Sequence, residues 1–381
     1  MPNEAGSSTK QLSGEAQYFS FRPTPLQNIK LGQFDSDFLT LLAKTNRSLS
    51  QLNTLANQIP DIDLFVSMYV RKESLLSSQI EGTQATLDDI LDPEVESNQN
   101  MNVAEVLNYI KATNYAIERL ETLPLCNRFL RETHKVLMAG LRGGEKSPGE
   151  FRTSQNWIGP QNSNLKTATY IPPSPEDMIV AMSDFEKYIN DPKDNLDYLI
   201  KIALIHYQFE TIHPFLDGNG RIGRLLIALY LRENGLLQQP VLYISYFLKL
   251  NQIEYYDRLT AVRERGDYHQ WIQFFIQAVH QTSLDATETI EKLVKLRAES
   301  REKVATLGRS AKSARLVYDY LERSPIIDIG KTSQELKMSF STVSRLVDKL
   351  CGLRILKQTE GNKRNRCFSY NEYLTILRKD T

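Results

Sequence analysis

Residues 212–226, IHPFLDGNGRIGRLL, place one histidine, one carboxylate, three glycines, one asparagine and two arginines between two apolar segments. His213 precedes Pro214, and the residue before a proline is disfavoured in the helical conformation, so we expect the first helix to end there. We expect the second helix to begin near Arg221, with its free N–H groups beside the backbone of residues 218–220. Backbone donors at a helix N-terminus favour phosphate, and glycine allows the close approach that binding requires. The stretch therefore predicts a phosphate-binding site.

The charged side chains of the same stretch extend this prediction. Arg221 and Arg224 are three positions apart, so both guanidinium groups leave one face of the helix and can bind phosphate oxygens in pairs. Asp217 would repel phosphate unless a cation lay between them, which suggests Mg²⁺, an ion that prefers carboxylate and phosphate oxygens. His213, whose ordinary pKa is near neutrality, is suited to accept a proton beside this site.

Plainer interpretations exist for each part of the motif. An isolated Asp-Gly-Asn-Gly segment is usually a turn, and a single histidine at a helix end is usually structural. Neither interpretation accounts for these residues occurring together between apolar helices. His206 lies seven positions before His213 on the same helix face, so a zinc site formed by His206, His213 and Asp217 is conceivable. We favour the alternative, in which His206 is a buried, hydrogen-bonded core histidine.

The segment HPFLDGNGRIGR resembles the signature of the Fic/Doc family, H-P-F-x-[D/E]-G-N-G-R-x-x-R, and matches it at every defined position. The similarity extends over about residues 70–280. Members of that family are helical enzymes, and most transfer AMP from ATP to a tyrosine, threonine or serine hydroxyl of a protein. The resemblance implies that His213 accepts the proton of the target hydroxyl, that Asp217 holds Mg²⁺ and that Arg224 binds the γ-phosphate. It assigns the rest of the phosphate site to Gly218, Asn219, Gly220, Arg221 and Gly223.

Residues 149–173 are rich in Gly, Pro, Asn and Ser and predict a long loop that carries an irregular hairpin. This loop resembles the family's flap, which lies over the site and is thought to align the target chain by strand addition. Arg263 falls where some relatives place an asparagine near the nucleotide. Simple core packing is the alternative for the aromatic residues of this group. The resemblance places beside the nucleotide Asn156, Trp157, Ile158, Gly159, Tyr255 and Tyr256.

The segment SSQIEG resembles the family's inhibitory motif, [S/T]-x-x-x-E-[G/N], here with Ser77, Glu81 and Gly82. A carboxylate at the end of a helix can pair with Arg224 and so exclude the γ-phosphate or twist ATP into an unproductive pose. The motif is weak alone, because Ser-x-x-x-Glu-Gly is common at helix ends. Its position before the core implies inhibition from an N-terminal helix. Some relatives use the same glutamate to position a water molecule that removes AMP, so AMP removal is an alternative activity.

The composition of the 381 residues is that of an ordinary globular protein, with 41% hydrophobic and 24% charged residues. Lys plus Arg equals Asp plus Glu, 46 each, so the overall charge predicts no partner. Three widely spaced cysteines suggest neither zinc nor a disulfide framework and favour a reducing compartment. The N-terminus lacks a secretory signal pattern and no apolar run reaches membrane-spanning length. We expect a cytoplasmic protein without a membrane partner.

The elements that must hold these residues are predicted to be mainly α-helical. Residues 1–100 are expected to form a loose arm of about 30 residues followed by helices, with the inhibitory helix at about 62–82. Residues 101–282 are expected to form the helical Fic core with its flap hairpin, and residues 283–310 a helical connector. Residues 311–381 follow the order of a winged helix-turn-helix, three helices and then a basic hairpin.

The last 71 residues are more basic than the rest of the chain, with 14 Lys/Arg against 8 Asp/Glu. This charge suits DNA, but winged helices also serve as protein-docking or dimerisation modules, and a homodimer is compatible with the sequence. The target protein, the modified residue and the oligomeric state are not determined by the sequence. The residues expected to face DNA are Ser341, Thr342, Ser344, Arg345, Lys363, Arg364 and Arg366.

These predictions together favour a protein adenylyltransferase that uses ATP and Mg²⁺, takes its target hydroxyl under the flap and is inhibited by Glu81. A nucleotide-sensing DNA-binding transcription regulator is the main alternative, although such a sensor has no need of the base His213. A different donor, such as UTP, remains open because the motif binds phosphates and not the base.

Overall fold

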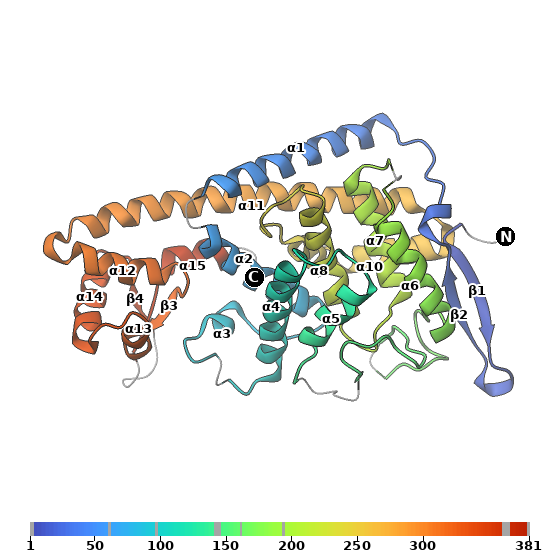
Figure 1. Ribbon diagram of the computed structural model, residues 1–381, viewed down its shortest axis with the longest axis horizontal. Coiled ribbons are helices and arrows are strands. Elements are labelled where there is room, and N and C mark those ends of the chain that lie inside the picture. Colours follow the sequence, from blue (N-terminus) through green and yellow to red (C-terminus); the bar gives the residue numbers. More distant parts are fainter. Residues whose placement is uncertain are drawn as a thin grey trace.

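The computed structural model describes residues 4–59, 62–95, 98–140, 146–160, 162–192, 195–359 and 366–378. The fold is mainly helical, as predicted, and α1 and α11 run side by side along the molecule (Figure 1). The hairpin of β1 and β2 lies at one end and the C-terminal unit at the other (Figure 1). The helices are α1 (Ser36–Gln58), α2 (Ile62–Ile80), α3 (Leu87–Leu91), α4 (Met101–Arg119), α5 (Asn127–Leu137), α6 (Pro175–Ile189), α7 (Tyr198–Ile212), α8 (Asn219–Glu233), α9 (Ile244–Leu250), α10 (Gln252–Arg265), α11 (Tyr268–Ala305), α12 (Ala311–Leu321), α13 (Ile329–Glu335), α14 (Phe340–Gly352) and α15 (Asn371–Arg378).

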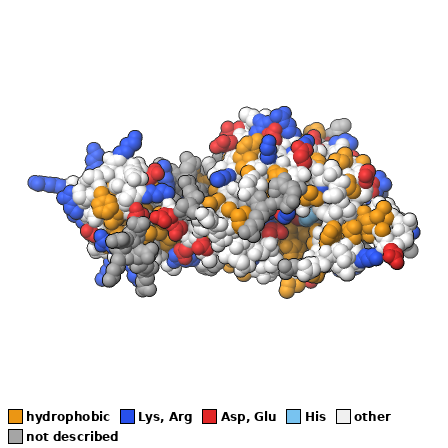
Figure 2. Space-filling view, turned by 90° about the horizontal axis from the view of Figure 1, so that it is seen from below, with side chains coloured by type: hydrophobic (Ala, Val, Ile, Leu, Met, Phe, Trp, Pro, Cys, Tyr) orange, Lys and Arg blue, Asp and Glu red, His pale blue; other side chains and the backbone are white. Residues whose placement is uncertain are grey.

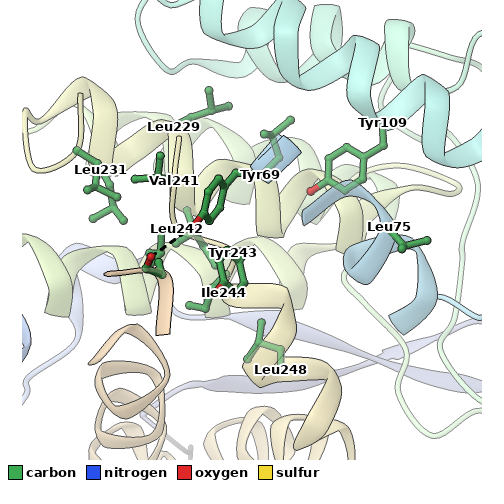
Figure 3. Packing of buried hydrophobic residues seen from close by; sticks show 14 of the residues in the cluster. Tyr69, Leu75, Tyr109, Leu229, Leu231, Val241, Leu242, Tyr243, Ile244 and Leu248 are labelled. Carbon is green, nitrogen blue, oxygen red and sulfur yellow. Dashed lines mark hydrogen bonds between the residues drawn. The ribbon is translucent and has the colours of Figure 1, made fainter. Parts of the chain in front are cut away.

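Helices α7 and α8 form the centre of the core. Every residue of α7 from Leu199 to Ile212 is buried, polar residues such as His206 and Glu210 included, so the helix is enclosed by the core on all sides. Figure 3 shows Leu229 and Leu231 of α8 in one buried cluster with Tyr69 of α2 and Tyr243. The turn between α7 and α8 is therefore supported on both sides by close-packed helices.

The predicted inhibitory helix corresponds to α2. It ends at Ile80, directly before Glu81, and Gly82 follows with a φ of +96°, a left-handed conformation that glycine adopts readily at a helix C-terminus. The OH of Tyr69 donates to the carbonyl oxygen of Ala286 in α11 at 3.4 Å. The helix is thus held in the core and directs its C-terminal end towards α8.

The expectation of a loose N-terminal arm was wrong. Residues Gly6–Gln11 (β1) and Tyr18–Pro23 (β2) form an antiparallel hairpin. The N–H of Phe21 donates to the carbonyl oxygen of Ile171 at 2.9 Å, which joins the hairpin to the flap loop. Strand β1 is polar, and in β2 Phe19 is exposed while Phe21 packs against Tyr170 of the flap. The hairpin therefore lacks a core of its own, and hydrophobic periodicity did not reveal it.

The predicted boundary between the core and the connector falls inside a single helix. Helix α11 continues for 38 residues through position 283, and Ala286, Ile290 and Leu293 beyond it are buried. This buried stripe packs against α1, so the charged residues around it form only the outer face.

The C-terminal unit contains α12–α15 and a sheet in which β5 (Cys367–Ser369) pairs antiparallel with both β3 (Ile326–Asp328) and β4 (Lys357–Gln358). The predicted order of three helices followed by two strands is present, with the second helix, α13, beginning at Ile329 after the N-cap Asp328, whereas β3 and α15 were not predicted. Figure 2 shows Lys and Arg side chains projecting from this end of the molecule. Lys363 and Arg364 lie outside the described residues, and the identification of the unit as a winged helix stays a prediction.

None of the described helices combines the length and the apolarity that a membrane crossing needs.

Candidate active site

The turn between α7 and α8 brings the motif residues together. Helix α7 ends at Ile212 as predicted, and His213 adopts a left-handed conformation with φ +51° and ψ +61°. The prediction that α8 begins near Arg221 was wrong, because the helix begins at Asn219 with Gly218 as its N-cap at φ +77°. Asn219 and Gly220 have poor helix propensity, yet the packing of α8 against α7 extends the helix over them. The unpaired N–H groups of the first turn therefore lie two residues closer to His213.

The loop between the helices is fastened by Asn219 and by a stacked aromatic pair. The Asn219 side chain accepts from the N–H of Phe215 and donates to its carbonyl oxygen, each at 2.8 Å. The Phe215 ring is buried and stacks on His134 with centroids 3.8 Å apart. The Nδ1 of His134 accepts from the N–H of Gly149, so its Nε2–H donates to the carbonyl oxygen of Asp217 at 2.9 Å. The side chain of Asn219 is thus fully used within the loop, so only its backbone N–H can bind a phosphate.

Arg152, which sequence analysis missed, ties the flap loop to this turn. Its Nε donates to the carbonyl oxygen of His213 at 3.0 Å, and its backbone N–H donates to that of Pro214 at 2.9 Å. Its Nη2 donates to the carbonyl oxygen of Pro173 at 2.6 Å. Burial lowers the pKa of Arg152 to about 10, so the guanidinium remains charged at neutral pH. Asn156 adds a hydrogen bond from Nδ2 to the carbonyl oxygen of Phe215 at 3.0 Å, so this predicted nucleotide-binding side chain supports the loop.

His213 is held as a neutral base. Its Nδ1 lies 3.3 Å from the carbonyl oxygen of Glu210, which can only accept, so the proton is on Nδ1 and the lone pair is on Nε2. Burial lowers the pKa of His213 to about 4, with the Glu81 carboxylate opposing this shift. The imidazole is therefore neutral at physiological pH and able to accept a proton.

Arg221 supplies buried donors that have no acceptor. Its side chain is 5% exposed, and among the described residues its Nε and Nη1 have no hydrogen-bond partner. Its Nη2 lies 3.5 Å from Oδ1 of Asp217 and 3.8 Å from the sulfur of Met138. Leaving a buried charged donor unpaired is unfavourable by several kcal/mol. An anion at the N-terminus of α8 would satisfy these donors.

Asp217 faces a cation already present in the chain. The Nζ of Lys146 lies 2.5 Å from its Oδ2, and the N–H of Gly218 donates to its Oδ1 at 2.6 Å. Burial alone would raise the pKa of Asp217, but Lys146 and Arg221 outweigh this and lower it. One ionised carboxylate beside a phosphate site is the donor set with which Mg²⁺ is usually held, its other ligands being phosphate oxygens and water. The carboxylate of Asp217 therefore fits Mg²⁺. In this structure the ammonium group of Lys146 lies beside that carboxylate, where the metal ion would bind.

His206 is the core histidine that we favoured over a zinc ligand. Its ring is buried, with Nδ1 2.9 Å from the carbonyl oxygen of Gly223 and Nε2 2.9 Å from the OH of Tyr255. Both nitrogens are therefore used within the core. Across the described part of the chain, no three His, Cys, Asp or Glu side chains form a metal-binding group.

Arg224 and Glu81 form the contact predicted from the SSQIEG motif. The Nη2 of Arg224 lies 2.6 Å from Oε1 of Glu81, and Ser77 accepts from Arg224 through its Oγ at 2.8 Å and its carbonyl oxygen at 2.9 Å. A Cβ added to Gly220 would lie 2.1 Å from Oε1 of Glu81, so the carboxylate rests on the first turn of α8. Burial alone would lower the pKa of Arg224, but Glu81 together with Tyr255, Glu210 and Tyr256 outweighs this and raises it. An anion of the chain itself thus occupies the N-terminal anion site of α8.

The predicted flap residues Trp157, Ile158 and Gly159 lie in an irregular hairpin at the surface. Ile158 pairs with Tyr170 in a single antiparallel bridge, so the hairpin is as irregular as expected. Trp157 is 42% exposed, with its Nε1 donating to the carbonyl oxygen of Ser163, and Gly159 packs so closely on Ser163 that an added Cβ would lie 2.7 Å from its Oγ.

Tyr255 is buried against His206 in the core, while Tyr256 is 42% exposed. The guanidinium of Arg263 lies 4.0 Å from the ring centre of Tyr170. The OH of Tyr170 in turn donates to the carbonyl oxygen of Thr211 at 2.7 Å, close to the end of α7. Of the tyrosine pair, Tyr256 is the member with an accessible ring.

Two buried carboxylates beside Arg224 were also missed. Burial raises the pKa of Glu73 and of Glu210 to about 7, in spite of the hydrogen bonds that Ser245 gives to Glu73. A Cβ at Gly223 would lie 2.2 Å from Oε1 of Glu210, which explains the glycine at this position by close packing. Burial suppresses the ionisation of both groups, whereas Glu81 forms a direct ion pair with Arg224 at 2.6 Å. No sequence pattern distinguishes such buried acids from exposed ones.

Comparison with known proteins agrees with this geometry. The family model described as Fic/DOC family N-terminal matches residues 39–118, and that described as Fic/DOC family matches residues 124–231, which include the turn from His213 to Arg224. The chain belongs to the Fic/DOC family. The matched Fic/DOC region ends within α8, so α9–α11 and the C-terminal unit lie beyond it.

The chain is similar to curated Fic proteins over part of their length. It is 30% identical over 188 residues to "Protein adenylyltransferase Fic" of Aedes aegypti, covering 49% of this chain and 33% of that protein. It is 26% identical over 220 residues to the protein of the same name from Drosophila melanogaster, covering 56% of this chain and 40% of that protein. The chain thus spans no more than about two fifths of these Fic relatives.

Solved Fic structures share the fold. A Fic family protein from Desulfovibrio desulfuricans G20 superposes with a TM-score of 0.57 at 20% identity, covering 89% of this chain and 97% of that one. A Fic domain containing signaling protein from Bacteroides thetaiotaomicron has a TM-score of 0.50 at 19% identity, covering 67% of this chain and 98% of that one. At these identities the likeness concerns the helical fold alone.

Proposed function

We propose that the chain is a protein adenylyltransferase that transfers AMP from ATP to a hydroxyl group of a protein. The observation that carries this proposal is the neutral His213 imidazole beside the anion site at the N-terminus of α8, where two buried Arg221 donors have no acceptor within the described part of the chain. The name of the curated relatives, protein adenylyltransferase, supports the same activity.

In the proposed reaction the hydroxyl oxygen of the target attacks the α-phosphorus of ATP. A new phosphorus–oxygen bond forms, the bond to the bridging oxygen breaks, and pyrophosphate leaves. The hydroxyl proton passes to Nε2 of His213. Mg²⁺, held by Asp217, would neutralise phosphate charge when bound. Arg221 and the first turn of α8 orient the phosphates, so that catalysis depends mainly on placement and electrostatic stabilisation.

We further propose that Glu81 inhibits this reaction. Its carboxylate lies on Gly220 and pairs with Arg224, the side chain expected to bind the γ-phosphate. Two anions cannot share this position without strong repulsion. ATP must therefore displace Glu81 or bind in a distorted pose. AMP removal assisted by the same glutamate is the secondary activity proposed for this geometry.

The donor and the activity are tested together by intact mass spectrometry of the Glu81→Gly protein after incubation with Mg²⁺ and each nucleoside triphosphate in turn. We expect a gain of one AMP unit with ATP and no gain with the other triphosphates. Transfer from UTP instead would assign another donor, and the absence of any gain would favour the nucleotide-sensing regulator over the enzyme.

The pH dependence of the reaction follows from the lowered pKa of His213. The reaction needs the neutral imidazole, and burial disfavours the charged form, so this form persists down to a pH of about 4. In the Glu81→Gly protein the rate of AMP transfer at subsaturating ATP should stay level from pH 8 to about pH 5. Removal of the Glu81 carboxylate lowers the pKa of His213 further, because this carboxylate stabilises the charged imidazole. Labelled-ATP transfer, measured with ATP affinity at each pH, checks this, and a midpoint near 6.5 would contradict it.

The remaining partners are proposals of the same kind. The flap is proposed to align the target chain, and the C-terminal unit to contact DNA through Ser341, Thr342, Ser344, Arg345 and Arg366. Duplex binding that weakens with salt and with Arg345→Ala would support DNA contact, while salt-independent behaviour would argue against it. A cytoplasmic location and a homodimer stay predictions, which fractionation and sedimentation of the full chain would test.

A further inference from the structure

The C-terminal unit contacts the chain on both sides of Glu81. Before Glu81, the Nη1 of Arg71 in α2 donates to the carbonyl oxygen of Arg323, just after α12, at 3.3 Å. After Glu81, the Nζ of Lys331 in α13 donates to the carbonyl oxygen of Pro93 at 2.8 Å. Arg378 of α15 also pairs with Asp88 of α3. The inhibitory segment is therefore bracketed by the C-terminal unit.

A cleft of about 150 Å³ lies at this junction. One wall comes from α2 and from residues 90–95, and the other from the end of α12, β3 and the start of α13. Three cationic side chains line it, Arg71, Arg323 and Lys331. Small-ligand sites occur preferentially at such junctions between structural units.

The two acidic side chains in the cleft are already used by the backbone. The Oδ1 of Asp92 accepts from the N–H of Glu94 at 2.7 Å, and the Oδ1 of Asp328 accepts from the N–H of Lys331 at 2.9 Å as the N-cap of α13. These contacts hold the carboxylates at the backbone of the cleft wall. With Arg71, Arg323 and Lys331 against these two carboxylates, the lining of the cleft has a net positive charge.

Arg71 is the central cation of this cleft. Among the described residues no carboxylate lies within 4 Å of its guanidinium group, or of that of Arg323. Arg71 is partly buried, and the loss of solvent lowers its pKa, which is the effect expected of a cation without a counter-charge. A partly buried cation of this kind gains considerably from an anionic ligand.

We propose that this cleft binds a small oxyanion, a phosphate or a carboxylate, with Arg71 and Arg323 as its charged ligands. The ligand would neutralise both guanidinium groups and hold α2 against the C-terminal unit. Arg71 lies in α2 ten residues before Glu81, which directly follows the end of that helix, so the two are about 15 Å apart along the helix axis. An occupied cleft therefore fixes the position of Glu81 over α8. This regulatory consequence rests on the proposed function, whereas oxyanion binding itself does not.

The binding is tested by thermal unfolding of the full chain in inorganic phosphate and in chloride at equal ionic strength. We expect a saturable rise in the melting temperature of the wild type with phosphate, and acetate in place of phosphate distinguishes a carboxylate ligand. Arg71→Met should weaken the apparent phosphate affinity at least about tenfold, whereas Arg71→Lys should retain part of it because it keeps the charge. Arg47→Met, at an exposed position of α1, is the matched control and should behave as the wild type.

Phosphate could also enter the nucleotide site, and a second variant separates the two sites. Arg224→Met removes one of the two guanidinium groups of that site and leaves the cleft intact, so its phosphate response should equal that of the wild type. A response lost in Arg224→Met and kept in Arg71→Met would overturn the proposal, as would the absence of any response to both anions in the wild type. If Arg71→Met does not fold, Arg323→Met at the exposed end of the cleft provides the same comparison. AMP transfer by the Glu81→Gly protein is measured separately and does not depend on these outcomes.

Discussion

Replacing Glu81 with glycine is expected to raise both ATP affinity and self-modification by about tenfold to a hundredfold. A carboxylate paired with a buried arginine costs several kcal/mol to remove when the pair is fully desolvated. The Arg224 side chain is 1% exposed, but that of Glu81 is 38% exposed, so solvent screening reduces the competition to about 1.5–3 kcal/mol. Calorimetric titration with ATP and Mg²⁺ measures the affinity, and intact mass measures the transferred AMP.

The conservative variant Glu81→Gln sharpens this test. It keeps the size and the hydrogen-bonding capacity of the side chain but removes its charge, so an intermediate increase is expected. Glu15→Gly, at an exposed position between β1 and β2, should behave as the wild type. Equal ATP affinity and equal transfer in the wild type and Glu81→Gly would show that the Glu81–Arg224 pair does not control the site.

Replacing His213 with alanine in the Glu81→Gly background is expected to reduce AMP transfer by about 10²- to 10⁴-fold, the usual effect of removing a general base. ATP affinity should change little, because the phosphate donors belong to α8, Arg221 and Arg224. The separation of binding from turnover is the decisive feature. Single-turnover transfer of labelled AMP and a parallel ATP titration measure the two quantities.

His269→Ala provides the control for this second prediction. His269 is exposed and packs on Phe34, away from the α7–α8 turn, so its loss should leave transfer unchanged. A His213→Ala protein that loses ATP affinity together with transfer would indicate that the histidine maintains the loop. One that retains full transfer would remove it from the proposed mechanism.

The sequence was informative where local chemistry decides the structure. Pro214 ends α7, and the glycines around Asn219 produce the turn. These effects depend on the backbone of a few neighbouring residues, so they can be predicted from a short window. The Ser77–Glu81 spacing likewise places Ser77 in the last turn of α2 and Glu81 directly after it.

The features that were missed depend on contacts between distant segments. Arg152 acquires its role because the fold brings the carbonyl oxygens of Pro173 and His213 to one guanidinium group. Glu210 is an unusual carboxylate only because α8 packs over it at Gly223. The β1–β2 hairpin is stabilised by distant segments, since Phe21 packs against Tyr170 of the flap and Arg22 lies 3.5 Å from Asp177 of α6. No window of sequence contains these partners.

The continuity of α11 has a consequence for the integrity of the whole chain. One uninterrupted helix contributes to the core through Trp271 and to the C-terminal unit through Arg297, which pairs with Glu322 at 2.9 Å. The exposed, extended connector at which proteases usually separate domains is therefore missing between these two parts. Shortening the protein at the predicted boundary would cut a folded helix and uncover its partner α1, so that both ends of the molecule should melt as a single cooperative unit.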